Sequence, residues 1–203
     1  MEQRKKNPIA TRARILKSAG EEYCRMGFQA ARLNAIVENA GITKGSLFHH
    51  FSGKDDLALQ WLLETLPPIL QRHWVIPLEQ TTNPIDALKQ IFRESSETFT
   101  RAHTANTGMH SMAKLMASID ESNKELHEAS IEIQQTWHRV VSEALLRGQR
   151  EKLVHAAIVV SDEAHFIISI AVGASIQSGV MGPGALTGWL RSADAYLETL
   201  RPA

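Results

Sequence analysis

The sequence predicts an all-α protein of about nine helices, with an N-terminal three-helix domain that carries a helix-turn-helix and a larger helical domain behind it. Three observations predict this class. Apolar residues recur at three- and four-residue spacing along most of the 203-residue chain. Glycines, prolines and capping residues separate these segments at lengths suited to helices. No segment alternates apolar and polar residues as a half-buried strand would.

The N-terminal part is expected to hold four helices, each bounded by a residue that starts or stops a helix. Serine and threonine side chains accept hydrogen bonds from free amides at helix starts, and glycine commonly follows a last turn. The first helix has an apolar face of Ile15, Ala19 and Tyr23. In order, the expected helices are residues 8–26 before Gly27, a short helix from Leu33 before Gly41, Lys44–His50 after Thr43, and a helix capped by Ser52 that Pro67-Pro68 should end or kink.

Beyond residue 68 the same signals predict five further helical segments. Asn83 can cap a helix that starts with Pro84, because proline suits the first helical position. The segments are expected over residues 84–99, 109–119, 122–148, 161–180 and 185–200. These assignments give one domain over residues 8–68, with the helix-turn-helix at residues 32–51, and a second domain over residues 69–203.

Composition narrows the classes of protein that the chain can represent. Apolar residues make up 43% and charged residues 22% of the chain, which is ordinary for a globular domain. The single cysteine, Cys24, excludes an intrachain disulfide and a thiolate zinc site. We find no signal peptide and no run of about 18 apolar residues that could span a membrane. We therefore expect a cytoplasmic protein that does not act at a membrane.

The zero net charge of the whole chain conceals an uneven distribution. Residues 1–54 hold ten Lys or Arg and four Glu, a net charge of +6, whereas residues 55–203 carry −6. A positive front on an acidic body can bind phosphate even when the whole chain is neutral. Because chance clustering on solvated helix faces is the alternative, the charge split indicates nucleic-acid binding only together with a motif.

Residues 32–51 have the pattern of a helix-turn-helix, in which two short helices are joined by a tight turn that contains glycine. Gly41 can supply the positive φ that this turn needs. Ile36 and Leu47 would pack the two helices together at a fixed angle, which leaves Lys44 on the outer side. Lysine, serine and histidine side chains at such positions can bond to bases or phosphates.

Further positions agree with this motif in order and spacing: Ile15-Leu16, Gly27-Phe28, Ile36-Val37, the run from Ala40 to Phe51, and Lys54. Together they resemble the N-terminal domain of tetracycline-repressor (TetR) family regulators over about residues 9–62. The resemblance implies that the helix Lys44–His50 enters the major groove and that a dimer binds two half-sites. The expected DNA-binding residues are Arg32, Thr43, Lys44, Gly45, Ser46, Phe48, His49, His50 and Lys54.

Two positions depart from the pattern of the family. Arg32 stands where threonine commonly touches phosphate, and it can serve that role with a longer reach. Phe48 stands where tyrosine is common, so one hydroxyl and its phosphate hydrogen bond are lost. Lys54 resembles the phosphate-binding lysine at the start of the next helix, where a helix N-terminus also favours phosphate.

The last two helices are candidates for a homodimer interface. One carries a stripe of small residues that allows close approach of another helix, and the other carries an apolar stripe. Two such helices from each chain would form an isologous interface; the alternative is that both stripes pack inside one chain. The candidate residues are Ala164, Ile168, Ala171, Ser175, Leu186, Trp189, Leu190, Ala193 and Leu197.

The middle helices carry large apolar and amphipathic residues that are candidates for a small-molecule pocket. Such a pocket combines an apolar lining with a few polar groups, although aromatic and methionine side chains at helical spacing also form plain core. The candidate residues are Trp74, Phe92, Phe99, His103, Met109, Met112, Met116, Trp137 and His138.

These features predict a ligand-responsive transcription regulator that has double-stranded operator DNA and a small-molecule effector of unknown identity as partners. The family default is a repressor whose homodimer leaves its operator when the effector binds. We expect no enzyme activity, cofactor or metal, because the sequence lacks a His-Glu-x-x-His motif, a Gly-rich phosphate loop and a Gly-x-Ser-x-Gly motif. The alternative is a helical dimeric sensor or adaptor that does not regulate through DNA.

Overall fold

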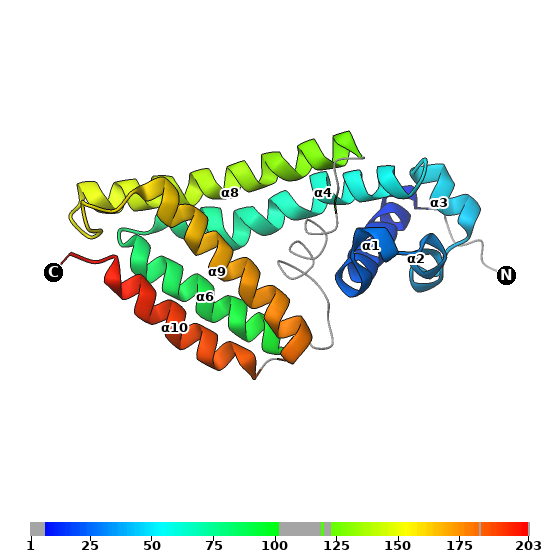
Figure 1. Ribbon diagram of the computed structural model, residues 1–203. Helices are drawn as coiled ribbons and strands as arrows, with labels where there is room; N and C mark the ends of the chain where they lie inside the picture. The colour runs from blue at the N-terminus through cyan, green and yellow to red at the C-terminus, as the bar shows by residue number, and fades with distance from the viewer. Residues whose placement is uncertain (1–6, 102–118, 120–122, 183, 203) are drawn as a thin grey trace.

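A computed structural model describes residues 7–101, 119, 123–182 and 184–202, and the regular elements in these ranges are all helical (Figure 1). This confirms the all-α prediction, and the helix predicted at residues 109–119 lies outside the described residues apart from Ile119. Within these ranges no helix combines the length and the apolar character needed to cross a bilayer. The elements are α1 (Pro8–Ala30), α2 (Leu33–Asn39), α3 (Lys44–His50), α4 (Lys54–Leu70), the π-helix η1 (Gln71–Val75), α5 (Ile76–Gln80), α6 (Pro84–Arg101), α8 (Lys124–Arg150), α9 (Val160–Met181) and α10 (Ala185–Thr199).

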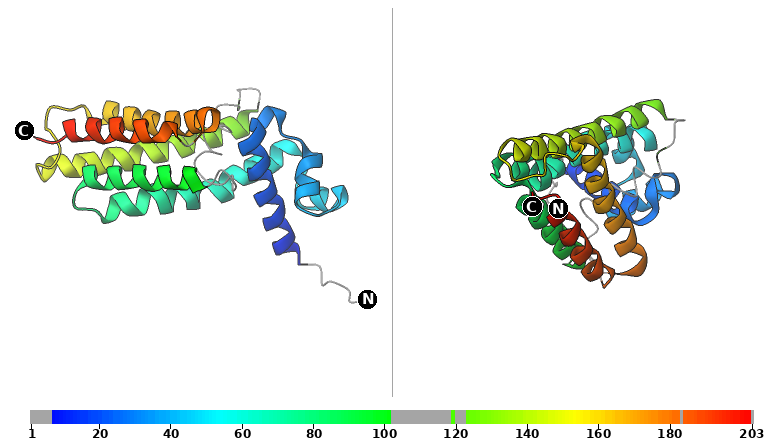
Figure 2. Two further views of the ribbon diagram at one scale, coloured as in Figure 1. Left: turned by 90° about the horizontal axis from the view of Figure 1, so that it is seen from below. Right: turned by 60° about the vertical axis from the view of Figure 1, so that its left-hand side comes forward.

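The helices form an elongated molecule whose two ends are built from different parts of the chain. Helices α1, α2 and α3 gather at one end, and the C-terminus lies at the opposite end (Figures 1 and 2). Helix α4 runs from the N-terminal group alongside α8, and α6, α9 and α10 pack together in the body. The two ends are therefore joined through α4.

Local capping sets several helix starts where the sequence predicts them. The Asn83 Oδ1 accepts a hydrogen bond from the Ile85 amide at 3.1 Å, and Pro84 opens α6. Helix α8 begins at Lys124 with Asn123 as its cap, two residues later than expected. The predicted break at Gly27 is present, with a φ of 73°, although one further helical turn follows to Ala30.

The helix that starts at Lys54 does not end at Pro67-Pro68, so the first of the two predicted outcomes, an end or a kink, is not found. Both prolines lie inside α4, and helical structure continues through η1 and α5 to Gln80. Each proline removes an amide donor and crowds the preceding turn, which costs about 3 kcal/mol or more. Burial compensates for this cost, because a stripe at four-residue spacing is buried along the whole path. The stripe comprises Leu66, Leu70, Trp74 and Leu78.

This helical path carries one apolar core from the N-terminal group into the body. Near its start, Leu57 and Trp61 pack in the same core cluster as residues of α1. Farther along, Trp74 joins the residues of α6 and α8. The predicted boundary between residues 68 and 69 thus falls within a continuous packed helix, and the division into two domains stays a prediction.

Candidate nucleic-acid interface

The helix-turn-helix is held together by apolar residues of α2 and α3. Ile36 and Leu47 are both fully buried, and Phe51, directly after α3, is 1% exposed. In the turn, the Ile42 amide donates a hydrogen bond to the Val37 carbonyl at 3.2 Å. Gly41 has a φ of 61°, in the left-handed region that favours glycine. These contacts fix the angle between the two helices as the sequence predicts.

The start of α3 is capped by a residue that also lies on the candidate DNA surface. The Thr43 Oγ1 accepts a hydrogen bond from the Ser46 amide at 3.1 Å, which satisfies one of the free donors of the first turn. Gly45 follows in the exposed first turn, and a Cβ there would meet nothing closer than the Thr43 Oγ1 at 3.9 Å. Because the chain's own packing does not require glycine here, the bare backbone suits a close external partner.

The predicted DNA-binding residues lie on the outer side of this unit, and none of them is buried. Lys44, Phe48 and His49 are exposed along α3, and Phe48 keeps 54% of its surface in solvent. Arg32 is exposed at the start of α2. The remaining predicted residues divide between exposed Thr43 and Gly45 and half-buried Ser46, His50 and Lys54.

Arg12 of α1 contacts residues that adjoin this surface, and the sequence analysis did not identify it. Its guanidinium lies 4.8 Å from the centroid of the Phe51 ring and forms an ion pair with Glu64 of α4. It also lies near His50, whose pKa is lowered by partial burial and by the positive charges of His49 and Arg12. The imidazole of His50 is therefore neutral at pH values where an ordinary histidine would already be partly charged.

Lys54 is engaged inside the chain rather than pointing freely into solvent. Its Nζ donates a hydrogen bond to the Gln29 carbonyl at 2.8 Å and lies 4.9 Å from the centroid of the Phe28 ring. Burial lowers the pKa of Lys54 below its ordinary value, and the carboxylate of Asp55 offsets part of this. The side chain therefore ties the start of α4 to the end of α1.

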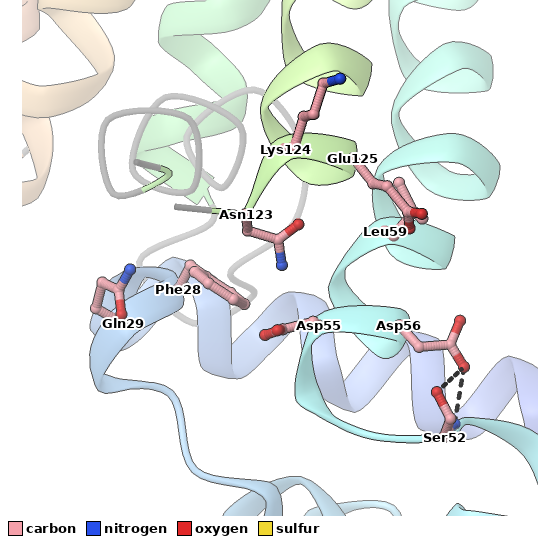
Figure 3. Close-up of a pocket in the computed structure, with 9 residues that line it drawn as sticks. All are labelled: Phe28, Gln29, Ser52, Asp55, Asp56, Leu59, Asn123, Lys124 and Glu125. Atoms are coloured by element: carbon pink, nitrogen blue, oxygen red, sulfur yellow. Dashed lines mark hydrogen bonds between the residues drawn. The ribbon is translucent and has the colours of Figure 1, made fainter. Parts of the chain in front are cut away.

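A hollow of about 700 Å³ lies between the start of α4, the end of α1 and the start of α8 (Figure 3). Among its charged lining residues, Asp55, Asp56 and Glu125 outnumber the single basic residue, Lys124. Like charge disfavours phosphate there, which leaves α3 as the candidate DNA surface.

The N-cap of α4 differs from the prediction. The Asp56 carboxylate accepts hydrogen bonds from the amide and the hydroxyl of Ser52, so Ser52 donates here and Gly53, not Ser52, is the N-cap of α4.

Three of the predicted pocket residues meet in the core of the body. The rings of Trp74 and Trp137 have centroids 4.8 Å apart, and Phe92 lies 6.2 Å from Trp74. All three side chains are fully buried, and the indole N–H of Trp137 has no acceptor among the described residues. His138 is separate: it is half-buried, with its ring centroid 4.0 Å from that of His165. The side chains of Phe99, His103, Met109, Met112 and Met116 lie outside the described residues.

The small-residue stripe of α9 lies inside the chain, in the core that α9 shares with α6 and α8. Ala164, Ile168, Ala171 and Ser175 are all buried, as are Leu186, Ala193 and Leu197 of α10. Helical periodicity thus identified a face of α9 that is packed, but this face packs against other helices of the same chain. An adjoining face of α9 remains open, with Phe166, Ile176 and Val180 at 53%, 41% and 81% exposure.

A groove of about 390 Å³ runs between α9 and α10 on this open side. Two of the predicted interface residues, Trp189 and Ala193, line it, together with Phe166 and Tyr196. The Trp189 indole donates a hydrogen bond to the Ile170 carbonyl at 3.1 Å, which fixes the floor of the groove. The predicted Leu190 is half-buried and is not among the lining residues.

The fold and the site define a helix-turn-helix protein with an exposed second helix and an all-helical body. Comparison with known families agrees: the sequence model "Bacterial regulatory proteins, tetR family" matches residues 15–60. The HTH-type transcriptional repressor KstR2 of Mycobacterium tuberculosis is 27% identical over 128 residues, which are 60% of this chain and 64% of that repressor. The match therefore spans less than two thirds of the length of this relative.

Solved structures share the fold over nearly the whole chain. A TetR-family transcriptional regulator from Agrobacterium tumefaciens has a TM-score of 0.84 at 17% identity, covering 97% of this chain and all of the other. The TetR-family regulator CifR, as a cysteine mutant complexed with operator DNA, has a TM-score of 0.75 at 17% identity, with 96% and 98% covered. Residues 15–60 are thus similar in sequence to bacterial regulatory proteins of the tetR family, and the whole chain shares the fold of solved TetR-family regulators. These relatives are described as transcriptional regulators.

Proposed function

We propose that this chain is a homodimeric transcriptional repressor that binds operator DNA through α3 and leaves it when a small molecule binds in the body. The observation that carries the proposal is the exposed face of α3. It leaves Lys44, Phe48 and His49 exposed, while Leu47 on the opposite side anchors the helix in the core. That CifR is described in a complex with operator DNA supports the same use of this fold.

Binding of the protein to DNA from upstream of its own gene tests the first part. We expect sequence-preferring binding that weakens steeply with salt. Lys44→Ala should weaken specific binding by about 1–3 kcal/mol if the lysine makes a bidentate base contact. Arg150→Ala is the control, because it removes an exposed positive charge at the end of α8 away from α3 (Figure 1). Equal effects of the two substitutions would contradict the assignment of α3.

Dimerisation is proposed through the open face of α9 and its groove against α10, rather than through the buried stripe. Phe166 is the aromatic residue of this face, and its ring packs edge-on to Tyr196 with centroids 4.9 Å apart. Phe166→Asp should convert a dimer into a monomer and weaken operator binding. Val159→Asp is the matched control, since Val159 is 61% exposed and is not among the lining residues of the groove. Light scattering of both variants measures the outcome, and a dimeric Phe166→Asp protein would refute this interface.

The effector pocket is proposed beside the aromatic cluster of Trp74, Phe92 and Trp137. The unpartnered indole N–H of Trp137 supplies a polar group in an apolar surrounding, which is the combination that fixes the orientation of a small ligand. Molecules that co-purify with the protein should lower operator affinity by about 5- to 150-fold, the usual range of allosteric coupling. Trp137→Phe keeps the ring but removes the N–H, so it should weaken this response. Operator binding that no candidate molecule changes would leave DNA binding standing and contradict ligand control.

A further inference from the structure

Glu22 of α1 is the only charged residue that is buried within the described part of the chain. Its side chain has no exposed surface. Both carboxylate oxygens have partners: the Oε2 lies 2.5 Å from the Nη2 of Arg25, and the Oε1 accepts a hydrogen bond from the backbone N–H of Arg32 at 3.2 Å. Burying a carboxylate is costly unless it is paired and hydrogen-bonded. The two interactions of the Glu22 carboxylate therefore compensate for the cost of burying it.

The hydrogen bond to Arg32 falls where α2 begins. Arg32 is the N-cap residue of α2, with an extended backbone and no side-chain capping bond. One turn before Glu22 in α1, the buried Ser18 hydroxyl donates a hydrogen bond to the Ile36 carbonyl at 2.9 Å. Two polar side chains on one face of α1 thus hold the backbone at the start and in the middle of α2.

The two partners of Glu22 have different effects. The backbone N–H of Arg32 is fixed from inside, while the guanidinium of Arg32 stays exposed on the candidate DNA surface. The Arg25 guanidinium is half-exposed and neutralises the carboxylate, so Glu22 adds little repulsion toward a phosphate. The pairing therefore holds Arg32 in place without opposing its contact.

We propose that Glu22 is a positioning residue for DNA binding, which holds the backbone of Arg32 so that its guanidinium meets a phosphate at each half-site. The inference rests on the proposed function. One phosphate contact contributes a salt slope of about 0.9, which corresponds to about eightfold in affinity at 0.1 M salt. Loss of the positioning should remove most of this factor for each half-site.

The test is a double-mutant cycle that combines Glu22→Leu with Arg32→Ala. Arg32→Ala removes the guanidinium but keeps the backbone N–H, so the hydrogen bond to Glu22 survives. In the wild-type background, Glu22→Leu should weaken operator binding about eightfold per half-site and lower the salt slope by about 0.9. In the Arg32→Ala background it should have almost no further effect. An equal loss in both backgrounds, or no loss in the wild-type background, overturns the proposal.

Glu22→Gln is the matched control, because its amide oxygen can still accept from the Arg32 N–H although its charge is lost. It should keep nearly the full salt slope, so it separates the hydrogen bond from the charge, and it keeps the proposal open to refutation if Glu22→Leu does not fold. A Glu22→Gln slope lowered by about 0.9 per half-site would overturn the proposal. The two levels of failure are distinct: wild-type protein without salt-dependent DNA binding rejects the proposed function, whereas wild-type binding with additive variants rejects only the role of Glu22.

Discussion

Replacing Gly20 with alanine tests how closely α1 packs on α4. Gly20 is buried in the middle of α1, and a Cβ there would lie 2.6 Å from the Nε1 of Trp61, with two further ring atoms at 3.1 and 3.2 Å. Trp61 is 2% exposed and meets the Tyr23 ring edge-on, with centroids 5.7 Å apart, so the indole has little room to retreat. The added methyl group must therefore push the two helices apart or force a strained rotamer.

Two opposing contributions decide whether Gly20→Ala raises or lowers the free energy of unfolding. Alanine is favoured over glycine inside a helix by about 1 kcal/mol, whereas overpacking a well-filled core costs about 1–3 kcal/mol. We expect Gly20→Ala to lower the free energy of unfolding by about 1 kcal/mol. Gly188→Ala in α10 has no heavy atom near its added Cβ, and it should gain up to about 1 kcal/mol from helix propensity alone.

Thermal unfolding of the two variants measures the difference, and urea unfolding checks it. A difference of about 2 kcal/mol corresponds to roughly 4–8 °C in Tm for a chain of this length. The reasoning fails if both substitutions raise Tm by similar amounts, since Trp61 would then yield to the methyl group without cost.

Three further predictions concern the helix-turn-helix and the start of α4. Thr43→Ala should remove the cap of α3, cost about 1 kcal/mol and speed amide exchange at Ser46, whereas Thr43→Ser should keep both. Operator affinity should rise as pH falls below the range in which an ordinary histidine titrates, because phosphate favours a charged His50 and burial, His49 and Arg12 lower the pKa of His50. A His50→Gln variant should lose this pH dependence. Lys54→Met should lower stability by about 1 kcal/mol through loss of the bond to Gln29. Its salt slope should stay near wild type, and a slope lowered by about 0.9 per half-site would show that Lys54 contacts phosphate instead.

The helix-turn-helix could be predicted because its determinants are local. Gly41 and Thr43 act within a few residues of their own positions, and the structure confirms both the turn and the cap. The apolar pattern likewise identified Ile36 and Leu47 as packed residues. Such features follow from the sequence without knowledge of distant contacts.

Other features depend on partners that are remote in sequence. Glu22 reads as one more charge on a helix, and only the fold brings the Arg32 amide to its carboxylate. Periodicity showed that Ala164 and Ile168 share a face but not that this face packs within the chain. The prolines of α4 carry a strong local breaking signal, and the buried stripe along the same helix outweighs it.

Helices α4, η1 and α5 form one continuous helical path, so the number of residues in η1 sets how the body is rotated relative to the helix-turn-helix. An α-helix turns about 100° per residue, so residues spaced by four drift steadily around its axis. The wider turn of η1 takes up part of that drift, and Leu66, Leu70, Trp74 and Leu78 all stay buried. One residue inserted or deleted between Gln71 and Val75 would rotate everything beyond it by about 100° relative to the helix-turn-helix. Insertions and deletions are thus better tolerated after α5, between Thr81 and Asn83. The chain is not helical there, so an added residue does not rotate the body relative to the helix-turn-helix.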